Sequence, residues 1–587
     1  MKRAGVVALA AVICGGCGGN STERPIAQFP SKDDLQRLAA RPSKPAPPVD
    51  TAPIDRWTID ATIPAPGAPY PTDDAWDRML AEGRASAASQ ARLAPELRCA
   101  AQESARFYVQ NGAFPDDSLR EYLLLRCGST LANVTARSLS GAVPDDTPDA
   151  KVQAFYAKSG RALVAEALAG GTEAGVAFAR GNGRAAAVAL YGSPTGRIQT
   201  VSSLVQGASV ILEGEAAPDA SFVMGFVTQG VFGVSLCEPD GTVKAPMFRL
   251  SCPVADADPQ ARIEIAMRKP GQVLMRRSLQ LLVRRQAEAG LEYEARPYGS
   301  EGPAANAEVF RSALVDGLNA ARAKAGARAL ALEPSQSHDS DALVSPYFDS
   351  ALRGKAEEVD TMALGLLAGW DVGGTIRDGG FYSQLAVASR SPGRWLTHAL
   401  ASPLGRWSLL DSSMARVAIG TGLVEPSGVM ALVTTYAFFE SSDHHPDEDA
   451  VFERLTRVRK ARGAPPPTRI PSDATLDKAL SEIMINAASS ATALEEVMQH
   501  VVSDQRRSVS GWYVETSDLK DLPFTDDLLA RSPLEVQIGV THHKAPGGAW
   551  GQYAVLIAIM GRPASDTKEA LGGSRKVARA SVAPPKL

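Results

Sequence analysis

Two histidine-rich stretches carry the residue types that bind metals or transfer protons. SSDHHPDEDA holds His444 and His445 among acidic residues, and THHKAPGG holds His542 and His543. Imidazole and carboxylate groups ligate divalent metals and act as general acids and bases. The first stretch lies between two predicted units and the second in a predicted hairpin loop, where solvated polar residues are the simpler interpretation. With no G-x-S-x-G, H-E-x-x-H or P-loop motif in the chain, we predict no catalytic residue, no metal site and no cofactor.

Cysteine spacing predicts two disulfides. Cys99, Cys127, Cys237 and Cys252 allow more than one pairing, and spacing favours Cys99–Cys127 and Cys237–Cys252, each within one predicted domain. A metal site built from all four thiolates is disfavoured because no C-x2-C spacing exists among them. Disulfides also agree with the export predicted from the N-terminus.

The N-terminus has the composition of a secretory signal. Lys2 and Arg3 precede an apolar run at 6–13, and a small-residue patch ends at Cys17. The run is too short for a membrane span. Gly15-Gly16-Cys17 resembles a bacterial lipobox, which implies lipid attachment at Cys17 and a cell-envelope protein, in the outer membrane and facing the periplasm or the cell surface. The lipid would be its contact with the membrane. Plain secretion is the alternative.

Length and charge limit the remaining possibilities. A chain of 587 residues exceeds the roughly 250–300 beyond which single cores divide, so several domains are expected. Its net charge of −4 gives no reason to expect nucleic acid as a partner. The predicted divisions are a signal peptide at 1–16, a Pro-rich linker at 17–75, a helical then β-hairpin domain at 76–192, a β-module at 195–290, two α/β domains at 305–440 and 450–562, and a disordered tail at 563–587.

Local patterns predict the elements within these divisions. AGVAFARGNGRAAAVALYG is typical of a hairpin with Asn182-Gly183 at its turn. Residues 195–290 contain short β-rich runs, which predict a small all-β sandwich. Its arginines at 276, 277, 284 and 285 could form an anion-binding edge, but a solvated edge strand protected by charge is the simpler interpretation.

The stretch SPLGRWSLLDSSMARVAIG at 402–420 predicts a loop, a short buried helix, a turn and a strand. A second strand follows at 429–439, with nine apolar residues in eleven. Upstream, EVFRSALVDGLNAARAKAGA is an amphipathic helix that ends at Gly326.

LNAARAKAGARALALEPS, SPLGRWSLLD, VAIG and the last strand, in this order, resemble the CAP domain. This superfamily of SCP-like extracellular domains includes cysteine-rich secretory proteins, insect antigen 5 and plant pathogenesis-related proteins. The resemblance implies a three-layer α-β-α sandwich at 305–440. The expected fold class is therefore multidomain α+β, with CAP-like sandwiches and a small all-β module.

The cavity that the resemblance implies lacks its usual ligands. The family typically places two His and two Glu there, often able to bind a divalent metal. Here Gly405 stands at the histidine of S-P-x-H-R, and Ser383 and Gln384 stand at the G-E-N segment. With Ser402 and Arg406 these residues would line a degenerate cavity. Gly, Ser and Gln do not replace imidazole or carboxylate ligands.

Residues 450–562 repeat the motifs of 305–440. Leu318, Arg322 and Gly326 align with Leu455, Arg459 and Gly463 at a constant offset (459 − 322 = 137). Leu409-Leu410 and Gly420 align with Leu528-Leu529 and Gly539 at a second offset (539 − 420 = 119). The domain at 76–192 is a candidate third copy.

Two functions fit these features. The first is a lipid-anchored, non-catalytic binding or structural module for an unknown envelope or extracellular ligand. The second is an envelope-acting hydrolase or metal-dependent enzyme with a relocated site, which requires at least two of Ser402, Arg406, Ser383 and His398 to converge in one pocket. We favour the first.

Overall fold

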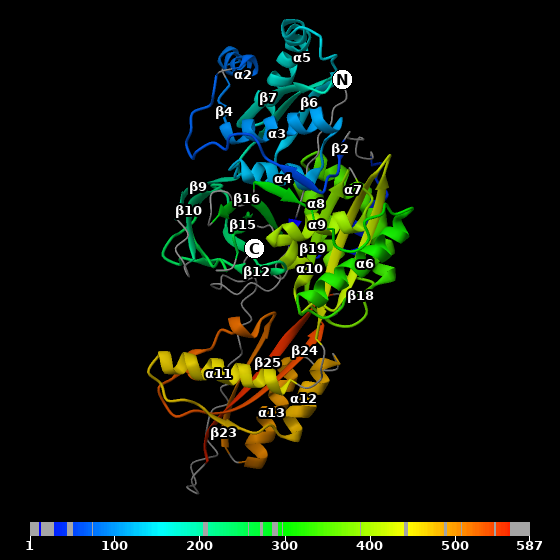
Figure 1. Cartoon of the computed structure of the whole chain (residues 1–587). Coiled ribbons are helices and arrows are strands. Elements are labelled where there is room, and N and C mark those ends of the chain that lie inside the picture. Colours follow the sequence, from blue (N-terminus) through cyan, green and yellow to red (C-terminus); the bar gives the residue numbers. More distant parts are fainter. Residues whose placement is uncertain are drawn as a thin grey trace. The chain divides into compact units, whose positions relative to one another are not determined.

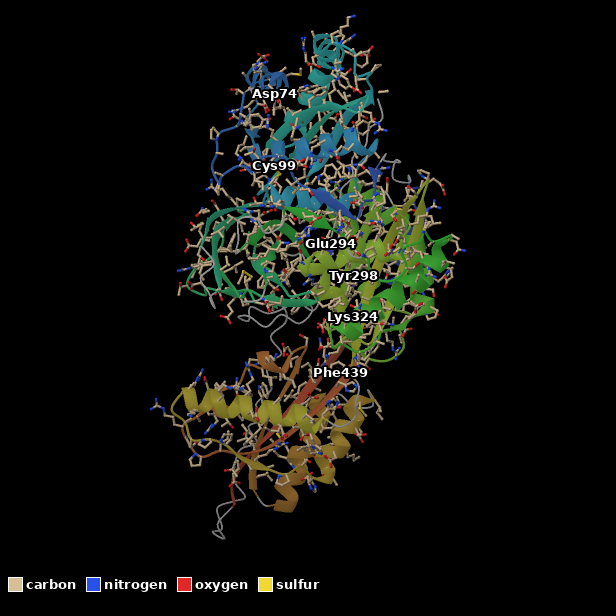
Figure 2. The ribbon with its side chains drawn as sticks, viewed as in Figure 1. Asp74, Cys99, Glu294, Tyr298, Lys324 and Phe439 are labelled. Carbon is tan, nitrogen blue, oxygen red and sulfur yellow. A yellow bond between two sulfur atoms is a disulfide. The ribbon has the colours of Figure 1, made fainter. Side chains whose placement is uncertain are left out.

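The computed structural model is of mixed α+β architecture (Figure 1). It describes residues 11–12, 29–43, 51–72, 74–87, 89–202, 209–255, 258–270, 274–284, 291–295, 297–387, 389–439, 444–485, 490–505, 507–544 and 548–563. These residues fall into two compact units, which we call the body (mainly Pro30–Leu367 with Gly380–Thr435) and the C-terminal unit (mainly Ala368–Gly379 with residues from Tyr436 onward). Side chains fill the space between the helices and sheets within each unit (Figure 2).

The same order of elements occurs three times along the chain: a helix, a short strand, two helices, a strand, a helical segment and a two-stranded hairpin. The first α/β set consists of α2 (Ala75–Ser86), β4 (Arg92–Leu93), α3 (Pro95–Asn111), α4 (Asp117–Arg126), β6 (Thr135–Ala142), α5 (Asp149–Gly170), β7 (Glu173–Gly181) and β8 (Arg184–Gly192). The second consists of α6 (Ala307–Lys324), β18 (Ala331–Leu332), α7 (Pro334–Leu352), α8 (Ala356–Ala368), β19 (Ile376–Ala386), α9 (Pro392–Ala401), α10 (Pro403–Leu410), β20 (Arg416–Val424) and β21 (Gly428–Phe438). The third consists of α11 (His445–Ala461), β22 (Thr468–Ile470), α12 (Ala474–Met484), α13 (Ser490–Gln505), β23 (Arg507–Thr516), η1 (Leu519–Asp521), α14 (Asp526–Leu529), β24 (Glu535–Lys544) and β25 (Gly551–Pro563).

The three sheets also share one strand order. The orders are β4-β7-β8-β6, β18-β20-β21-β19 and β22-β24-β25-β23. In each sheet the short outer strand lies parallel to its neighbour. The domain at 76–192 therefore has the topology of the other two sets. Its hairpin turns at Asn182 and Gly183 as predicted, and both residues have positive φ (51° and 68°).

Helices cover both faces of the first and third sheets. On β8, Ala186, Val188 and Leu190 face a core shared with α3 and α4. The alternate residues Ala185, Ala187 and Ala189 face a second core, shared with α2 and α5. Successive strand side chains point to opposite faces, so the apolar run at 185–190 agrees with a strand that is buried on both faces. The third sheet likewise separates two cores, one with α11 and one with α12 and α13.

A buried arginine near the end of the first helix makes matching contacts in the second and third sets. Arg322 donates to the backbone oxygens of Arg328 and Leu409 at 2.7 Å each, and also to those of Asp411 and Met414. Arg459 donates to those of Pro465, Leu528 and Ser532 at 2.5–2.8 Å. Each guanidinium joins its helix to the segment before the hairpin. These contacts match the alignment of Arg322 with Arg459 made from the sequence.

Residues 196–284, together with Ala11–Val12, form two antiparallel sheets around one apolar core. The larger has the order β1-β16-β15-β11-β12 and the smaller β13-β14-β10-β9. Their strands are β1 (Ala11–Val12), β9 (Gly196–Val201), β10 (Val210–Ala216), β11 (Phe222–Gln229), β12 (Gly233–Leu236), β13 (Glu238–Pro239), β14 (Met247–Cys252), β15 (Gln260–Arg268) and β16 (Met275–Arg284). On β15, Ile263 and Ile265 face this core, whereas Arg262 and Glu264 lie on the other face of the strand.

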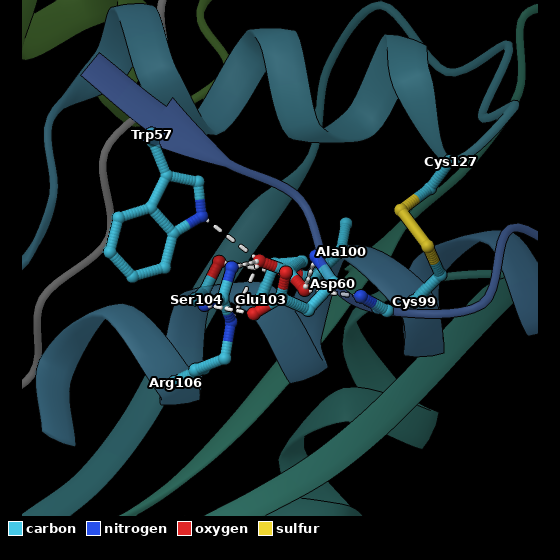
Figure 3. The surroundings of a disulfide bond; sticks show 9 residues. Trp57, Asp60, Cys99, Ala100, Glu103, Ser104, Arg106 and Cys127 are labelled. Atoms are coloured by element: carbon cyan, nitrogen blue, oxygen red, sulfur yellow. Dashed lines mark hydrogen bonds and ion pairs between the residues drawn. A yellow bond between two sulfur atoms is a disulfide. The ribbon is translucent and has the colours of Figure 1, made fainter. Parts of the chain in front are cut away.

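The sequence predicts a linker at 17–75. This prediction is wrong for the described residues of that range, which include a short helix and short strands. These elements are α1 (Lys32–Ala39), β2 (Thr51–Ala52), which is parallel to β5 (Phe114–Pro115), and β3 (Arg56–Thr58), which is antiparallel to β17 (Glu292–Glu294). Trp57 is buried, and its indole nitrogen donates to Glu103 at 2.9 Å (Figure 3). The same carboxylate accepts from the backbone nitrogens of Asp60 and Ala61. Proline content indicated a spacer, but the contact of Trp57 with the buried Glu103 holds this segment against α3.

Both predicted disulfides are present, Cys99–Cys127 and Cys237–Cys252. The first joins α3 to the end of α4 (Figure 3), and the second joins the β12–β13 connection to β14. Among the residues that the structure describes, no helix is long and apolar enough to cross a membrane. Cys17, nearly all of the predicted signal peptide, and residues 564–587 lie outside the described residues.

Candidate functional site

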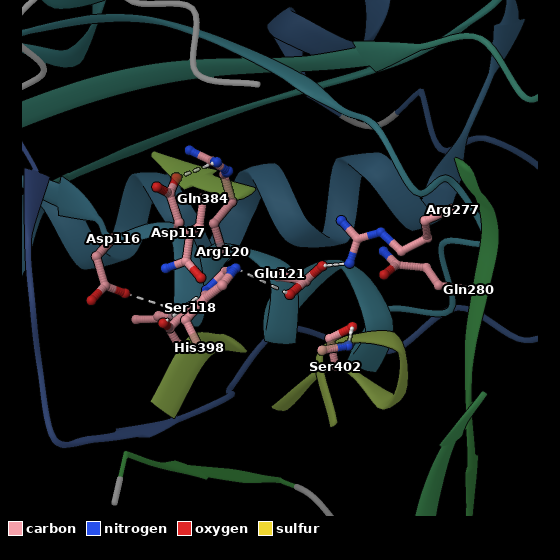
Figure 4. Close-up of polar contacts among 12 residues, drawn as sticks. Asp116, Asp117, Ser118, Arg120, Glu121, Arg277, Gln280, Gln384, His398 and Ser402 are labelled. Carbon is pink, nitrogen blue, oxygen red and sulfur yellow. Dashed lines mark hydrogen bonds and ion pairs between the residues drawn. The ribbon is translucent and has the colours of Figure 1, made fainter. Parts of the chain in front are cut away.

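A buried polar network in the body joins the first α/β set, the β-module and the second α/β set (Figure 4). Its charged members are two arginines and two glutamates, all buried: Glu121 on α4, Arg262 and Glu264 on β15, and Arg277 on β16. The two positive and two negative charges sum to zero, and each charge lies next to charges of the opposite sign. Buried charges are tolerated only when paired in this way.

Each carboxylate of the network contacts both guanidiniums. Arg262 lies 2.8 Å from Glu121 and also pairs with Glu264, while Arg277 pairs with Glu121 and lies 3.0 Å from Glu264. The second oxygen of Glu264 accepts from Ser402 Oγ at 2.6 Å and from the Leu404 backbone nitrogen at 3.2 Å. Since Ser402 is the N-cap of α10, Glu264 ties the β-module to the start of that helix.

The network fixes the charge states of its members. Burial opposes ionisation of Glu121, but Arg262 and Arg277 outweigh it and hold its pKa well below the usual range. The same balance of burial against the two arginines lowers the pKa of Glu264. For His398 on α9, burial dominates and lowers the pKa, which favours the neutral ring. None of these groups is set to exchange protons near neutral pH, which indicates a structural network.

A cavity of about 30 Å³ adjoins the network, lined in part by Glu121, Arg277, Gln280 and His398. It has room for about one or two water molecules. Small-molecule sites usually enclose roughly 300–1,000 Å³. The network therefore has no space for an organic substrate.

The predicted degenerate cavity is closed by the protein's own backbone. A Cβ atom placed on Gly405 would lie 1.9 Å from the Ala399 carbonyl oxygen and 3.3 Å from the Tyr382 ring. Ser383 on β19 is hydrogen-bonded to the Tyr347 hydroxyl at 2.9 Å, and Gln384 accepts from the Tyr382 hydroxyl at 3.1 Å. There is thus no room at position 405 for a histidine side chain.

The residues predicted for a relocated enzyme site have separate partners. Ser402 bonds to Glu264, and Arg406 donates to the carbonyl oxygens of Leu400, Gly230 and Gly233. His398 Nδ1 instead lies 3.0 Å from the Ser118 hydroxyl, and its Nε2 lies 3.7 Å from Glu121. A hydroxyl, an imidazole and a carboxylate in this order are typical of nucleophilic catalysis. Here the carboxylate is already held by two arginines.

Sequence reasoning missed the network, and it was wrong about Arg277. This residue is buried and ion-paired rather than solvated, because its guanidinium lies against Glu121 on α4 and Glu264 on β15. Arg276 pairs with Asp360, and Arg285 lies outside the described residues. One signal was available. In the sequence RIEI, Arg262 and Glu264 are two positions apart and so lie on the same face of a strand, while the isoleucines make its other face apolar.

The two histidine-rich stretches, treated as separate exposed segments in the sequence, meet in the C-terminal unit. His444 Nδ1 lies 2.7 Å from Asp447, and its Nε2 lies 2.8 Å from His542 Nδ1. His542 stacks on Phe439 with ring centroids 4.6 Å apart. His543 instead faces Glu515 at 3.2 Å, and His445 is exposed. We call Asp447, His444 and His542 the histidine relay.

The histidine relay predicts acid lability of the C-terminal unit. Burial and the neighbouring His444 lower the pKa of His542 to about 4, although Asp447 opposes this. The folded state therefore binds this proton less readily than the unfolded state. Stability is fully present above the ordinary histidine pKa of about 6.5 and falls as pH drops towards 4. We expect His542→Phe, which keeps a ring on Phe439, to flatten the pH dependence of the urea midpoint between pH 7 and 4.5. The exposed control His445→Gln should follow wild type, and a His542→Phe profile equal to wild type would contradict the assignment.

Within the described ranges, no group of three or more His, Cys, Asp or Glu side chains is arranged to hold a metal ion. The histidine relay brings together two imidazoles that are hydrogen-bonded to each other. No family model matches the chain, and no curated protein matches its sequence.

Proposed function

We propose that this chain is a non-catalytic binding protein of the bacterial cell envelope, built from CAP-like units and a β-module. Support comes from the repeated order of elements and from the helices on both faces of the first and third sheets. Helices on both faces of these two sheets support the proposal, because the resemblance implies a three-layer α-β-α arrangement for residues 305–440. We extend the proposal to the first α/β set, which would be a third CAP-like unit.

The observation that carries the proposal is the closed site at Gly405. The position that holds a metal-binding histidine in the family has a backbone oxygen 1.9 Å from where its Cβ would lie. The neighbouring polar groups of Ser383 and Gln384 already have hydrogen-bond partners. A domain with this packing keeps a rigid surface for binding but has no metal chemistry at the family position.

The two disulfides indicate an oxidising compartment, outside the cytoplasm. We further propose lipid attachment at Cys17, which would tether the protein to the outer membrane. Cleavage before Cys17 would also remove β1, whose two residues pair with Met275 and Arg276. Incorporation of labelled palmitate into wild type, and its loss in Cys17→Ser, would support the anchor. Unlabelled wild type would contradict it.

Metal titration tests the absence of metal-dependent catalysis. The chain from Cys17 onward should show no bound metal by elemental analysis and no melting-temperature shift with Zn²⁺ or Mg²⁺, since only a ligand that binds the native state raises it. The exposed His445 could bind Zn²⁺ at the surface, so His445→Gln serves as the matched control. Stoichiometric metal that persists in His445→Gln and is lost in His398→Gln would overturn the proposal.

A serine hydrolase is the second candidate, because Ser118, His398 and Glu121 follow one another at 3.0 and 3.7 Å. Ser118 is half-buried. A fluorophosphonate probe reacts with an activated serine and distinguishes the two functions. We expect no labelling. Labelling that disappears in both Ser118→Ala and His398→Gln would favour the hydrolase.

A further inference from the structure

A groove of about 490 Å³ lies in the body, away from the buried polar network, and its wall carries two arginines. Four segments form it: the N-terminal segment at Pro53, residues 301–305 before α6, residues 389–394 at the start of α9, and the β20–β21 turn at 426–427. Its volume is within the range of small-molecule sites. Prolines 53, 303 and 426 line it, so parts of its wall have fixed φ angles.

Backbone contacts hold the groove open in one shape. The Gly393 nitrogen donates to the Ser300 oxygen at 2.9 Å, and the Ala304 nitrogen donates to the Arg390 oxygen at 3.0 Å. Ser391, the N-cap of α9, also donates through its hydroxyl to Ser300. A preformed site of this kind loses little conformational entropy when a ligand enters.

Two of the residues that line the groove are arginines, and each is paired with a carboxylate outside the lining. Arg390 and Arg394 both line it, against the single acidic lining residue Glu301. Arg394 lies in the first turn of α9, where the helix dipole adds positive potential. Arg390 is held in place by the backbone oxygens of Val424 and Gly428.

Both arginines pair with carboxylates that are themselves almost free in solvent. Arg394 contacts Asp55 at 2.6 Å, and Arg390 contacts Glu425 at 2.8 Å. The arginine side chains are only 21% and 16% exposed, whereas Asp55 and Glu425 are 70% and 86% exposed. Because one partner of each ion pair is mostly exposed, water screens the attraction between the two charges. A ligand carboxylate could replace either partner at little cost.

From this geometry we propose that the groove binds a small organic anion with two carboxylates. Each guanidinium already donates to a carboxylate, at 2.8 Å for Arg390 and 2.6 Å for Arg394, and a guanidinium matches a carboxylate in geometry. Asp55 and Glu425 act as internal competitors that the ligand displaces. The inference deepens the proposed binding function by naming a ligand class. Metal titration tests the closed site at Gly405, whereas ligand titration tests this groove. The proposed function and the ligand class of the groove can therefore fail independently.

Calorimetric titration of the full-length chain with glutarate at low ionic strength tests the proposal. Glutarate should bind more tightly than butyrate, which has one carboxylate, and more tightly than inorganic phosphate. Arg390→Gln and Arg394→Gln should each weaken glutarate binding about tenfold or more. Arg416→Gln is the matched control, because its guanidinium pairs with Glu333 at 2.7 Å and does not line the groove.

The competitor variants give a readout that a merely structural role of these arginines would not produce. Asp55→Asn and Glu425→Gln should tighten glutarate binding, by up to about fivefold each, because they release a guanidinium. Absence of glutarate binding, equal affinity for phosphate, or unchanged affinity in both arginine variants would overturn the proposal. Weaker binding in both competitor variants would also overturn it.

Discussion

Replacing Glu264 with alanine is expected to lower the stability of the body by about 3–5 kcal/mol, the cost of leaving a buried charge unpaired. Glu264 is fully buried and contacts Arg262, Arg277, Ser402 and the Leu404 backbone. Without it, two buried guanidiniums would share the single carboxylate of Glu121. The start of α10 would lose two hydrogen bonds at the same time.

Urea denaturation combined with hydrogen exchange would measure this loss. Because the chain has two compact units, a single transition need not describe it, and exchange on β15 and α10 reports on the body. Asp219→Ala is the matched control. Its pair with Lys269, which directly follows the same strand, is exposed and should contribute little to stability. A Glu264→Ala effect as small as the control would show that the network carries little of the stability.

Placing a histidine at position 405, where the CAP resemblance implies one, is expected to destabilise the body without creating a metal site. The added Cβ would meet the Ala399 carbonyl oxygen, a backbone atom that cannot rotate away. Overpacking of this kind costs about 1–3 kcal/mol and occasionally more. Gly405→Ala separates the clash of the added Cβ from the effect of the imidazole ring. Because it adds only the Cβ, it should already lower the melting temperature.

The control for this pair is Gly302→Ala, where a Cβ would meet nothing within 4 Å. That substitution should be close to neutral or slightly stabilising. If Gly405→His kept wild-type stability and gained Zn²⁺ binding, the site would be open rather than closed. The proposed absence of metal binding would then depend on the single residue at position 405.

Features set by neighbouring residues could be predicted from the sequence. The turn at Asn182-Gly183 follows from a two-residue rule, and the second-set helix that ends before Gly326 follows from its apolar spacing. The disulfides followed from short separations of 28 and 15 residues. The match between Arg322 and Arg459 was visible because the same letters recur at a fixed offset.

Features made by distant residues could not be predicted. Glu121 meets Arg262 across 141 positions, and His444 meets His542 across 98. A single glutamate in a helix or a single histidine in a loop has no local signature that specifies such a partner. Composition was also misleading for the N-terminal segment, where proline content hid the docking of Trp57. The groove at Arg390 and Arg394 depends on that same segment and was missed for the same reason.

The pairing of β3 with β17 has a consequence for the order in which the chain is completed. Arg56 and Glu294 face each other although 238 residues separate them. A ribosome that adds about 5–20 residues per second makes the second strand on the order of ten seconds or more after the first. During that interval the first α/β set can form its own sheet, but Trp57 on β3 lacks Tyr293, its partner on β17. A chain interrupted before β17 would therefore leave β3 without its partner strand.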